Sequence, residues 1–208
     1  MSRKTEDFLD RAYGLKSLED AMSFYSEWAG DYDEQMEGKL NYVAPRQAAE
    51  QLARHLNGRS ARIVDIGCGT GLTSLYLHRH GFRDMDGIDL ADAMLERARS
   101  RDIYHALIKA DLTQPLALED ASYDAAISSG TFTLGHVGSE PIDEIFRILR
   151  SDALFACTIH RDIWQPLGFA AKFAQLEADG KLETVEIEQG HFFSHLEPAA
   201  KYCVFRKV

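Results

Sequence analysis

The sequence has little of what marks a membrane, secreted or nucleic-acid-binding protein. No apolar run approaches the roughly 18 residues that a membrane span requires, and the charged segment Met1–Asp7 is unlike a signal peptide. Among its 208 residues, 33 are acidic and 23 are basic, and so acidic a surface repels phosphate backbones. We therefore expect a cytoplasmic protein that binds neither a membrane nor nucleic acid.

Cysteines and clustered metal ligands are also scarce. Cys68, Cys157 and Cys203 are odd in number and far apart, so they form neither a disulfide framework nor a CxxC metal site. His191 and His195 are four residues apart, but no third ligand can be named beside them. The sequence therefore predicts reduced cysteines and no metal.

Proline is rare as well, and nothing in the chain resembles a linker or a repeat. Five prolines are spread along it, which predicts a single domain over residues 1–208. Within residues 1–40, apolar side chains from Leu18 to Tyr32 recur at three- and four-residue steps, as on one face of a helix. We expect this part to form an N-terminal helical lid in front of a core over residues 41–208.

After a helix predicted over Pro45–Leu56, apolar strands alternate with helices. Such alternation predicts an α/β domain whose parallel sheet is covered on both faces. The last two strands have no helix between them, so the final strand must join antiparallel to its predecessor. The expected strands are 61–66, 85–90, 103–110, 123–129, 153–159, 182–188 and 201–206, and the expected helices are 72–80, 92–101 (capped by Asp92), 139–149 and 167–178.

A glycine-rich loop follows the first strand and opens the next helix, as a nucleotide-binding loop does. It reads Asp65-Ile-Gly-Cys-Gly-Thr-Gly71, with GxGxG spacing. A dinucleotide fingerprint would need glycine at position 72, where the chain has Leu72. The carboxylate of Asp65 repels phosphate and attracts an ammonium group. The alternative is a tight strand–helix turn in which this aspartate only caps the helix.

Two further strands end in an aspartate, Asp89 and Asp111. An acidic residue about 20 positions after the glycines is placed to accept hydrogen bonds from ribose hydroxyls, which fits Asp89. The carboxyl ends of parallel strands line the ligand crevice of a doubly wound sheet. Together with Asp65, these residues predict a crevice edged by three carboxylates.

From about Tyr25 to the C-terminus, the chain resembles the class I S-adenosylmethionine-dependent methyltransferases. The glycine loop resembles the first motif of that family. The segments Tyr25–Asp33, Asn41–Pro45 and Ile163–Phe169 are more narrowly similar to the methyltransferase-like proteins of the Williams–Beuren region. The resemblance implies a Rossmann-like doubly wound, mostly parallel seven-stranded sheet with an antiparallel last strand. It also implies S-adenosylmethionine as the cofactor.

The resemblance assigns roles to the loop and to the strand ends. The glycines would lie against the methionine part of the cofactor, Asp65 near its ammonium group, Asp89 at the ribose and Asp111 at the adenine amine. Tyr25 or Tyr32 would contact the cofactor from the lid, and the alternative for both is core packing. Arg46 would pair with the cofactor carboxylate, and the alternative is a surface position. The cofactor-binding set comprises Asp65, Gly67, Cys68, Gly69, Gly71, Asp89, Leu90, Asp111, Leu112, Ser128, Tyr25, Tyr32 and Arg46.

The segment after the fourth strand, Ser128–His136, bears on catalysis. It lacks the Asn/Asp-Pro-Pro-Tyr/Phe motif of enzymes that methylate the amino groups of adenine bases or glutamine. His136 is a candidate general base, as is His160 after the fifth strand. The alternative for each is a histidine hydrogen-bonded to backbone.

The predicted function is therefore transfer of the methyl group of S-adenosylmethionine to an unidentified acceptor. An acidic chain without an added recognition domain favours a small-molecule acceptor, and a protein acceptor is the alternative. Two other classes stay open, namely a cofactor-binding protein without catalysis and a nicotinamide-dependent oxidoreductase. Leu72 and Asp65 argue against the oxidoreductase.

Overall fold

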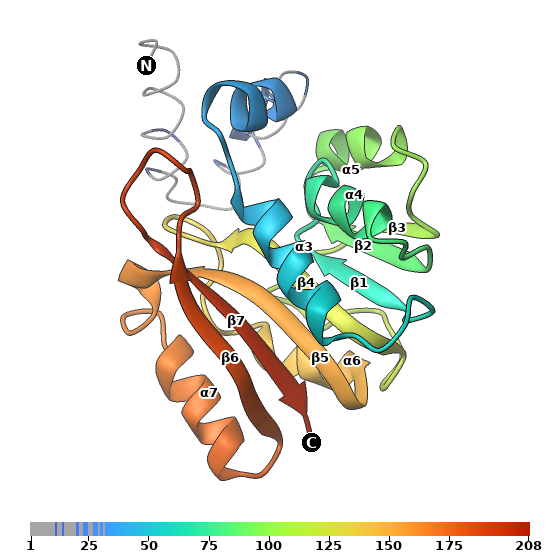
Figure 1. The fold of residues 1–208 in the computed structure, drawn as a ribbon, viewed down its shortest axis with the longest axis vertical. Coiled ribbons are helices and arrows are strands. Elements are labelled where there is room, and N and C mark those ends of the chain that lie inside the picture. The colour runs from blue at the N-terminus through green and yellow to red at the C-terminus, as the bar shows by residue number, and fades with distance from the viewer. Residues whose placement is uncertain are drawn as a thin grey trace.

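A seven-stranded sheet forms the centre of the computed structural model, with strand order β3-β2-β1-β4-β5-β7-β6 (Figure 1). Strands β1 to β5 are parallel to one another, and β7 is antiparallel to both β5 and β6. This topology confirms the predicted mixed sheet with its antiparallel last strand. The strands are β1 (Ile63–Ile66), β2 (Met85–Asp89), β3 (Ala106–Lys109), β4 (Tyr123–Phe132), β5 (Leu149–His160), β6 (Leu182–Gly190) and β7 (Ala200–Lys207).

The structure describes residues 32–208, together with residues 11, 14, 20, 23, 24, 27, 28 and 30. Most of the predicted lid over residues 1–40, including Tyr25, lies outside the described residues, so the lid stays a prediction. Within the described part of this segment, Glu34–Lys39 form the short π-helix η1.

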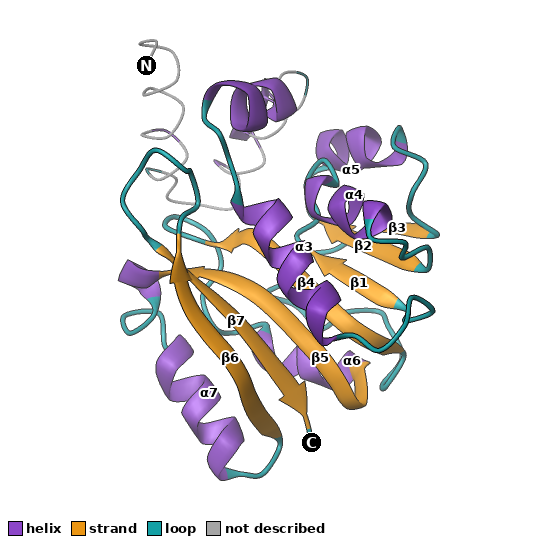
Figure 2. Cartoon of the chain, viewed as in Figure 1, coloured by secondary structure: helices purple, strands orange, loops and turns teal. Residues whose placement is uncertain are grey.

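Helices cover both faces of the sheet (Figure 2). Successive residues of β1 show why: Ile63 belongs to the hydrophobic cluster beneath α3 and α4, whereas Val64 belongs to the cluster beneath α6 and α7. Because both faces are covered, β1 is buried along its whole length. The helices are α3 (Ala44–His55), α4 (Leu72–Arg79), α5 (Asp92–Arg99), α6 (Ile142–Ile148), the 3₁₀ turn η2 (Arg161–Ile163) and α7 (Phe169–Ala178).

The predicted cap of α5 is wrong. The N-cap position is Ala91, and no side chain caps the helix there. Asp92 is exposed, and its carboxylate pairs with Lys109 Nζ at 2.5 Å. The N–H of Ala91 donates instead to Asp89 Oδ1 at 2.9 Å. The aspartate that ends β2 therefore satisfies the backbone at the start of α5.

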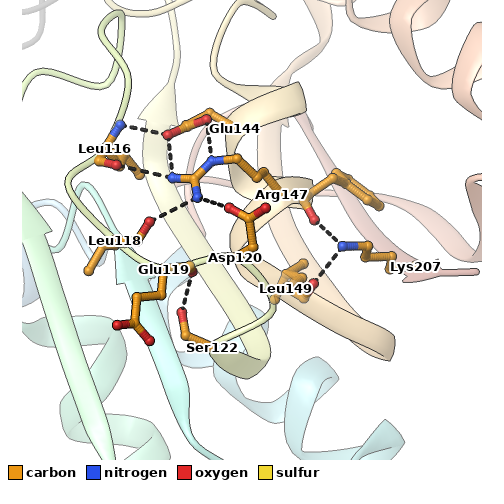
Figure 3. A network of polar contacts seen from close by, with 10 residues as sticks. Leu116, Leu118, Glu119, Asp120, Ser122, Glu144, Arg147, Leu149 and Lys207 are labelled. Carbon is orange, nitrogen blue, oxygen red and sulfur yellow. Dashed lines mark hydrogen bonds and ion pairs between the residues drawn. The ribbon is translucent and has the colours of Figure 1, made fainter.

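Arg147 of α6 holds the long connection between β3 and β4 (Figure 3). Its guanidinium donates to the carbonyl oxygens of Leu118 at 2.8 Å and Leu116 at 3.0 Å. Hydrogen bonds to Glu144 and Asp120 raise the pKa of Arg147, so the side chain stays charged. The connection between β3 and β4 contains no helix, and the guanidinium of Arg147 holds it through several hydrogen bonds at once.

Within the described residues, no helix is both long enough and apolar enough to cross a membrane.

Candidate functional site

A cavity of about 720 Å³ opens where β1, β2, β3 and β4 end. Its wall combines the glycine loop after β1, the residues that follow β2 and β3, residues 129–131 in the irregular part of β4, and the segment after β4. Tyr42, which precedes α3, also lines the cavity. The cavity lies at the carboxyl edge of the sheet, where open α/β folds bind their ligands, and its volume suits a cofactor with a small group beside it.

The glycine loop needs glycine at two positions for different reasons. Gly67 has a φ of 69°, and an added Cβ would lie 2.2 Å from Thr131 Oγ1. Gly69 has a φ of 54°, and an added Cβ would meet nothing within 4 Å. Gly67 is therefore packed against the protein, whereas Gly69 presents bare backbone to open space in the cavity wall.

Asp89 lines the cavity and also holds the loop. Its Oδ2 accepts from the N–H of Gly69 at 2.8 Å, and its Oδ1 accepts from the N–H of Ala91 at 2.9 Å. Burial raises the pKa of this carboxyl, and the two backbone hydrogen bonds oppose that shift. Each carboxylate oxygen keeps a second lone pair for a ligand. The role in holding the loop is one that the sequence analysis missed.

Asp65 lies beneath the loop and does not line the cavity wall. Its side chain is buried, and its Oδ2 accepts hydrogen bonds from Ser74 Oγ at 2.7 Å and from the Tyr104 hydroxyl at 3.0 Å. Its Oδ1 accepts no hydrogen bond from the described residues. Burial raises the pKa of Asp65 to about 6. The structure thus brings Asp65 to the loop from below, and its predicted contact with an ammonium group stays a prediction.

The raised pKa of Asp65 predicts a pH-dependent stability. In the unfolded chain the pKa of Asp65 is near 3.9, about two units below its value in the folded chain. The stabilisation that this difference gives to the folded state is therefore complete below pH 4 and is lost as the pH rises through 6. A pKa difference of two units corresponds to at most about 3 kcal/mol in the free energy of unfolding. We expect the unfolding free energy, measured by urea titration, to fall less from pH 4.5 to pH 7.5 in Asp65→Asn than in the wild type. Equal pH slopes in the two proteins would contradict this assignment.

His136 faces the same cavity from the segment after β4. Its Nδ1 lies 2.8 Å from the carbonyl oxygen of Leu134 and 2.9 Å from Thr133 Oγ1. Because a carbonyl only accepts, we assign the proton of the neutral ring to Nδ1 and the lone pair to Nε2. Burial lowers the pKa of His136, which keeps the ring neutral at pH 7. A neutral ring with its lone pair on Nε2 has the form that a general base needs.

The cavity wall contains nine of the predicted site residues. They come from the glycine loop, the ends of β2 and β3, the segment after β4, and the chain before η1. They are Gly67, Cys68, Gly69, Asp89, Leu90, Asp111, Leu112, His136 and Tyr32.

Two predicted residues near the loop are set back from the wall. Ser128 is completely buried, and its hydroxyl donates to the carbonyl oxygen of Ile66 at 2.8 Å, which ties β4 to β1. Gly71 has a φ of 87° and precedes α4, and an added Cβ would lie 3.0 Å from the ring of Tyr104. Neither residue lines the cavity wall, and direct cofactor contacts for them stay predictions.

Arg46 and His160 also lie away from the described cavity wall. Arg46 pairs with Glu50 one helical turn further along α3, at 3.0 Å, and its side chain is 46% exposed. This position agrees with the surface alternative. His160 is buried, stacks on the ring of Phe192, and accepts at Nδ1 from the N–H of Asp162 at 3.2 Å. These contacts leave His136 as the histidine that reaches the cavity.

The sequence analysis missed Tyr42 as a site residue. Its hydroxyl lies 2.4 Å from where a Cβ would stand on Gly130, so that glycine gives it room. The ring packs on Phe193 at 5.1 Å between centroids, and residues 42 and 193 form an isolated β-bridge. The sequence signal was weak, because the placement of Tyr42 depends on a loop between the last two strands. Among the described residues, no three potential ligands gather to hold a metal ion.

Comparisons with known proteins agree with this geometry. Residues 64–157 match the family model for a methyltransferase domain. Human Methyltransferase-like protein 27 is 36% identical over 137 residues, which cover 64% of this chain and 56% of that protein. An 18S rRNA (guanine-N(7))-methyltransferase from Bos taurus is 39% identical over 66 residues, or 32% of this chain and 23% of that protein. The chain thus matches about half, or less, of the length of these relatives.

Solved structures of other proteins share this fold. The TehB-like SAM-dependent methyltransferase from Corynebacterium glutamicum aligns with a TM-score of 0.65 at 17% identity, covering 89% of this chain and 99% of that one. Residues 64–157 thus match a methyltransferase domain, and the chain has the fold of the S-adenosylmethionine-dependent methyltransferases. The match implies S-adenosylmethionine as the cofactor. The similarity to the methyltransferase-like proteins of the Williams–Beuren region is likewise confirmed.

Proposed function

We propose that this chain binds S-adenosylmethionine in the cavity and transfers its methyl group to a small-molecule acceptor. The observation that carries the proposal is the open face of Gly69 in the same wall as the carboxylates of Asp89 and Asp111. A bare backbone lets a ligand approach closely, and the carboxylates supply acceptors for hydroxyl and amine groups. The residues present therefore fit the cofactor.

Each part of the wall then has a role toward the bound cofactor. Asp89 accepts hydrogen bonds from the ribose hydroxyls while its other lone pairs keep Gly69 and Ala91 in place. Asp111 accepts from the adenine amine, and Leu90 and Leu112 pack on the faces of the ring. The bound cofactor supplies a methyl group on a positively charged sulfur, and the chain positions the acceptor opposite it.

His136 and Tyr42 belong to the acceptor side of the cavity in this proposal. An oxygen nucleophile must lose its proton, and Nε2 of the neutral His136 ring takes it. A nitrogen or sulfur nucleophile often needs positioning alone, which can supply about 7–11 kcal/mol of the barrier. The Tyr42 hydroxyl bounds the space near Gly130 and orients the acceptor by a hydrogen bond.

The class of acceptor is proposed from the size of the cavity and the acidity of the chain. A protein acceptor is the alternative. The expected exclusion of nucleic acid finds no support among the relatives, since one of them is named an 18S rRNA methyltransferase. We keep the cytoplasm as the expected compartment.

The proposal predicts cofactor binding and turnover. S-adenosylmethionine and S-adenosylhomocysteine should bind with micromolar dissociation constants, equivalent to about 8 kcal/mol, in isothermal titration calorimetry. NAD serves as the control ligand and should give no heat. Incubation with S-adenosylmethionine and a metabolite extract, with and without nuclease and protease treatment, should release S-adenosylhomocysteine. Absence of binding would refute the proposal, whereas binding without release from any extract would favour a cofactor-binding protein.

A further inference from the structure

Asp33 joins the glycine loop to the segment that precedes α3. Its Oδ1 accepts from the Thr70 hydroxyl at 2.6 Å, and its Oδ2 pairs with the guanidinium of Arg101. Arg101 Nε in turn donates to the carbonyl oxygen of Thr70 at 2.5 Å. The three residues thus form a closed triangle of polar contacts, which we call the Asp33 triangle.

One member of the Asp33 triangle, Thr70, lines the cavity, and the chain neighbour of Asp33, Tyr32, lines it too. Thr70 stands between Gly69 and Gly71 of the loop. The Arg101 side chain is 16% exposed and that of Asp33 is 35% exposed, so water screens this pair less than it screens a fully exposed one. The Asp33 triangle therefore connects the glycine loop to the chain next to Tyr32.

We propose that Asp33 is a positioning residue that couples the glycine loop to Tyr32 and thereby sets the affinity for the cofactor. This inference rests on the proposed function. Glycines make the loop costly to order, and contacts that hold it in its binding conformation before the ligand arrives reduce that cost. Asp33 provides such contacts from a part of the chain far from the loop in sequence.

Glu37 offers a matched control in the same segment. It lies four residues after Asp33, and its Oε1 accepts from the Tyr76 hydroxyl at 2.5 Å. Each carboxylate thus ties the segment to the core through one hydroxyl. Asp33 reaches the loop, whereas Glu37 reaches α4. A comparison of the two separates coupling to the loop from simple docking of the segment.

The test is calorimetric titration of S-adenosylhomocysteine into the wild type, Asp33→Asn and Glu37→Gln. Asparagine keeps the shape of the side chain but places an NH₂ group against Thr70 or Arg101. We expect about 5- to 50-fold weaker binding in Asp33→Asn, the size of a typical coupling between sites, and less than about 2-fold in Glu37→Gln. Equal weakening in both variants, or none in Asp33→Asn, would overturn the inference.

Variants of Thr70, whose hydroxyl donates to Asp33, give a second test, and the single variants do not depend on the folding of Asp33→Asn. Thr70→Val removes the hydroxyl and should weaken binding to a similar extent, whereas Thr70→Ser keeps the hydroxyl and should weaken binding less than Thr70→Val does. In the double variant Asp33→Asn/Thr70→Val, the two effects should not add. Full additivity would mean that Thr70 acts only by touching the ligand. If the wild type itself fails to bind, the proposed function fails instead.

Discussion

Asp89→Ala should weaken the binding of S-adenosylhomocysteine about 10- to 150-fold. The substitution removes hydrogen bonding to a charged carboxylate, at a total cost of about 1.5–3 kcal/mol of binding free energy. Calorimetric titration measures the effect. The substitution also releases the N–H groups of Gly69 and Ala91, so we expect the free energy of unfolding in urea to fall by about 1–3 kcal/mol. Loss of both affinity and stability would identify Asp89 as a binding residue that the fold also uses.

Asp92→Ala is the matched control for this prediction. Asp92 lies three residues further on, carries the same charge, and is exposed beside Lys109. The Asp92→Ala variant should bind S-adenosylhomocysteine with a dissociation constant within about 2-fold of that of the wild type, because a surface ion pair contributes little free energy. Asp89→Asn keeps the shape of the side chain and should lose less affinity than Asp89→Ala. Wild-type affinity in Asp89→Ala would mean that the carboxylate only holds the backbone.

The order of strands and helices could be predicted because each element carries its own local signal. The strand β1 is an uninterrupted apolar run apart from Asp65, and the glycine at position 71 precedes α4 as the loop pattern indicates. The missing helix between β6 and β7 predicted the reversed strand. These signals depend only on residues that are neighbours in the sequence, so they can be recognised without any knowledge of tertiary contacts.

The three aspartates show where this reasoning reaches its limit. In sequence, Asp65, Asp89 and Asp111 all stand at the ends of strands. In the structure, Asp89 is the last residue of β2 and reaches the cavity, whereas Asp65 lies inside β1 and points beneath the loop toward Ser74 and Tyr104. The direction of a side chain near a strand end depends on partners elsewhere in the chain. The pairing of Arg46 with Glu50, by contrast, follows from their spacing of four residues and was predictable.

Gly69→Ala should abolish measurable binding of S-adenosylhomocysteine while leaving the protein folded. The added methyl group meets no protein atom within 4 Å and would stand in the space where we propose that the cofactor lies. A φ of 54° costs an alanine about 1–2 kcal/mol, which lowers stability without unfolding the protein. Calorimetry and urea unfolding on the same sample measure both effects.

Two other glycines separate the steric effect on the ligand from strain in the backbone. Gly180, in the turn between α7 and β6, has a φ of 68° and also meets nothing within 4 Å. Gly180→Ala should therefore lose as much stability as Gly69→Ala and bind normally. Gly67→Ala should unfold most easily of the three, because its methyl group would lie 2.2 Å from Thr131 Oγ1. If Gly69→Ala binds as well as Gly180→Ala, the ligand does not lie against Gly69, and the proposed placement of the cofactor is wrong.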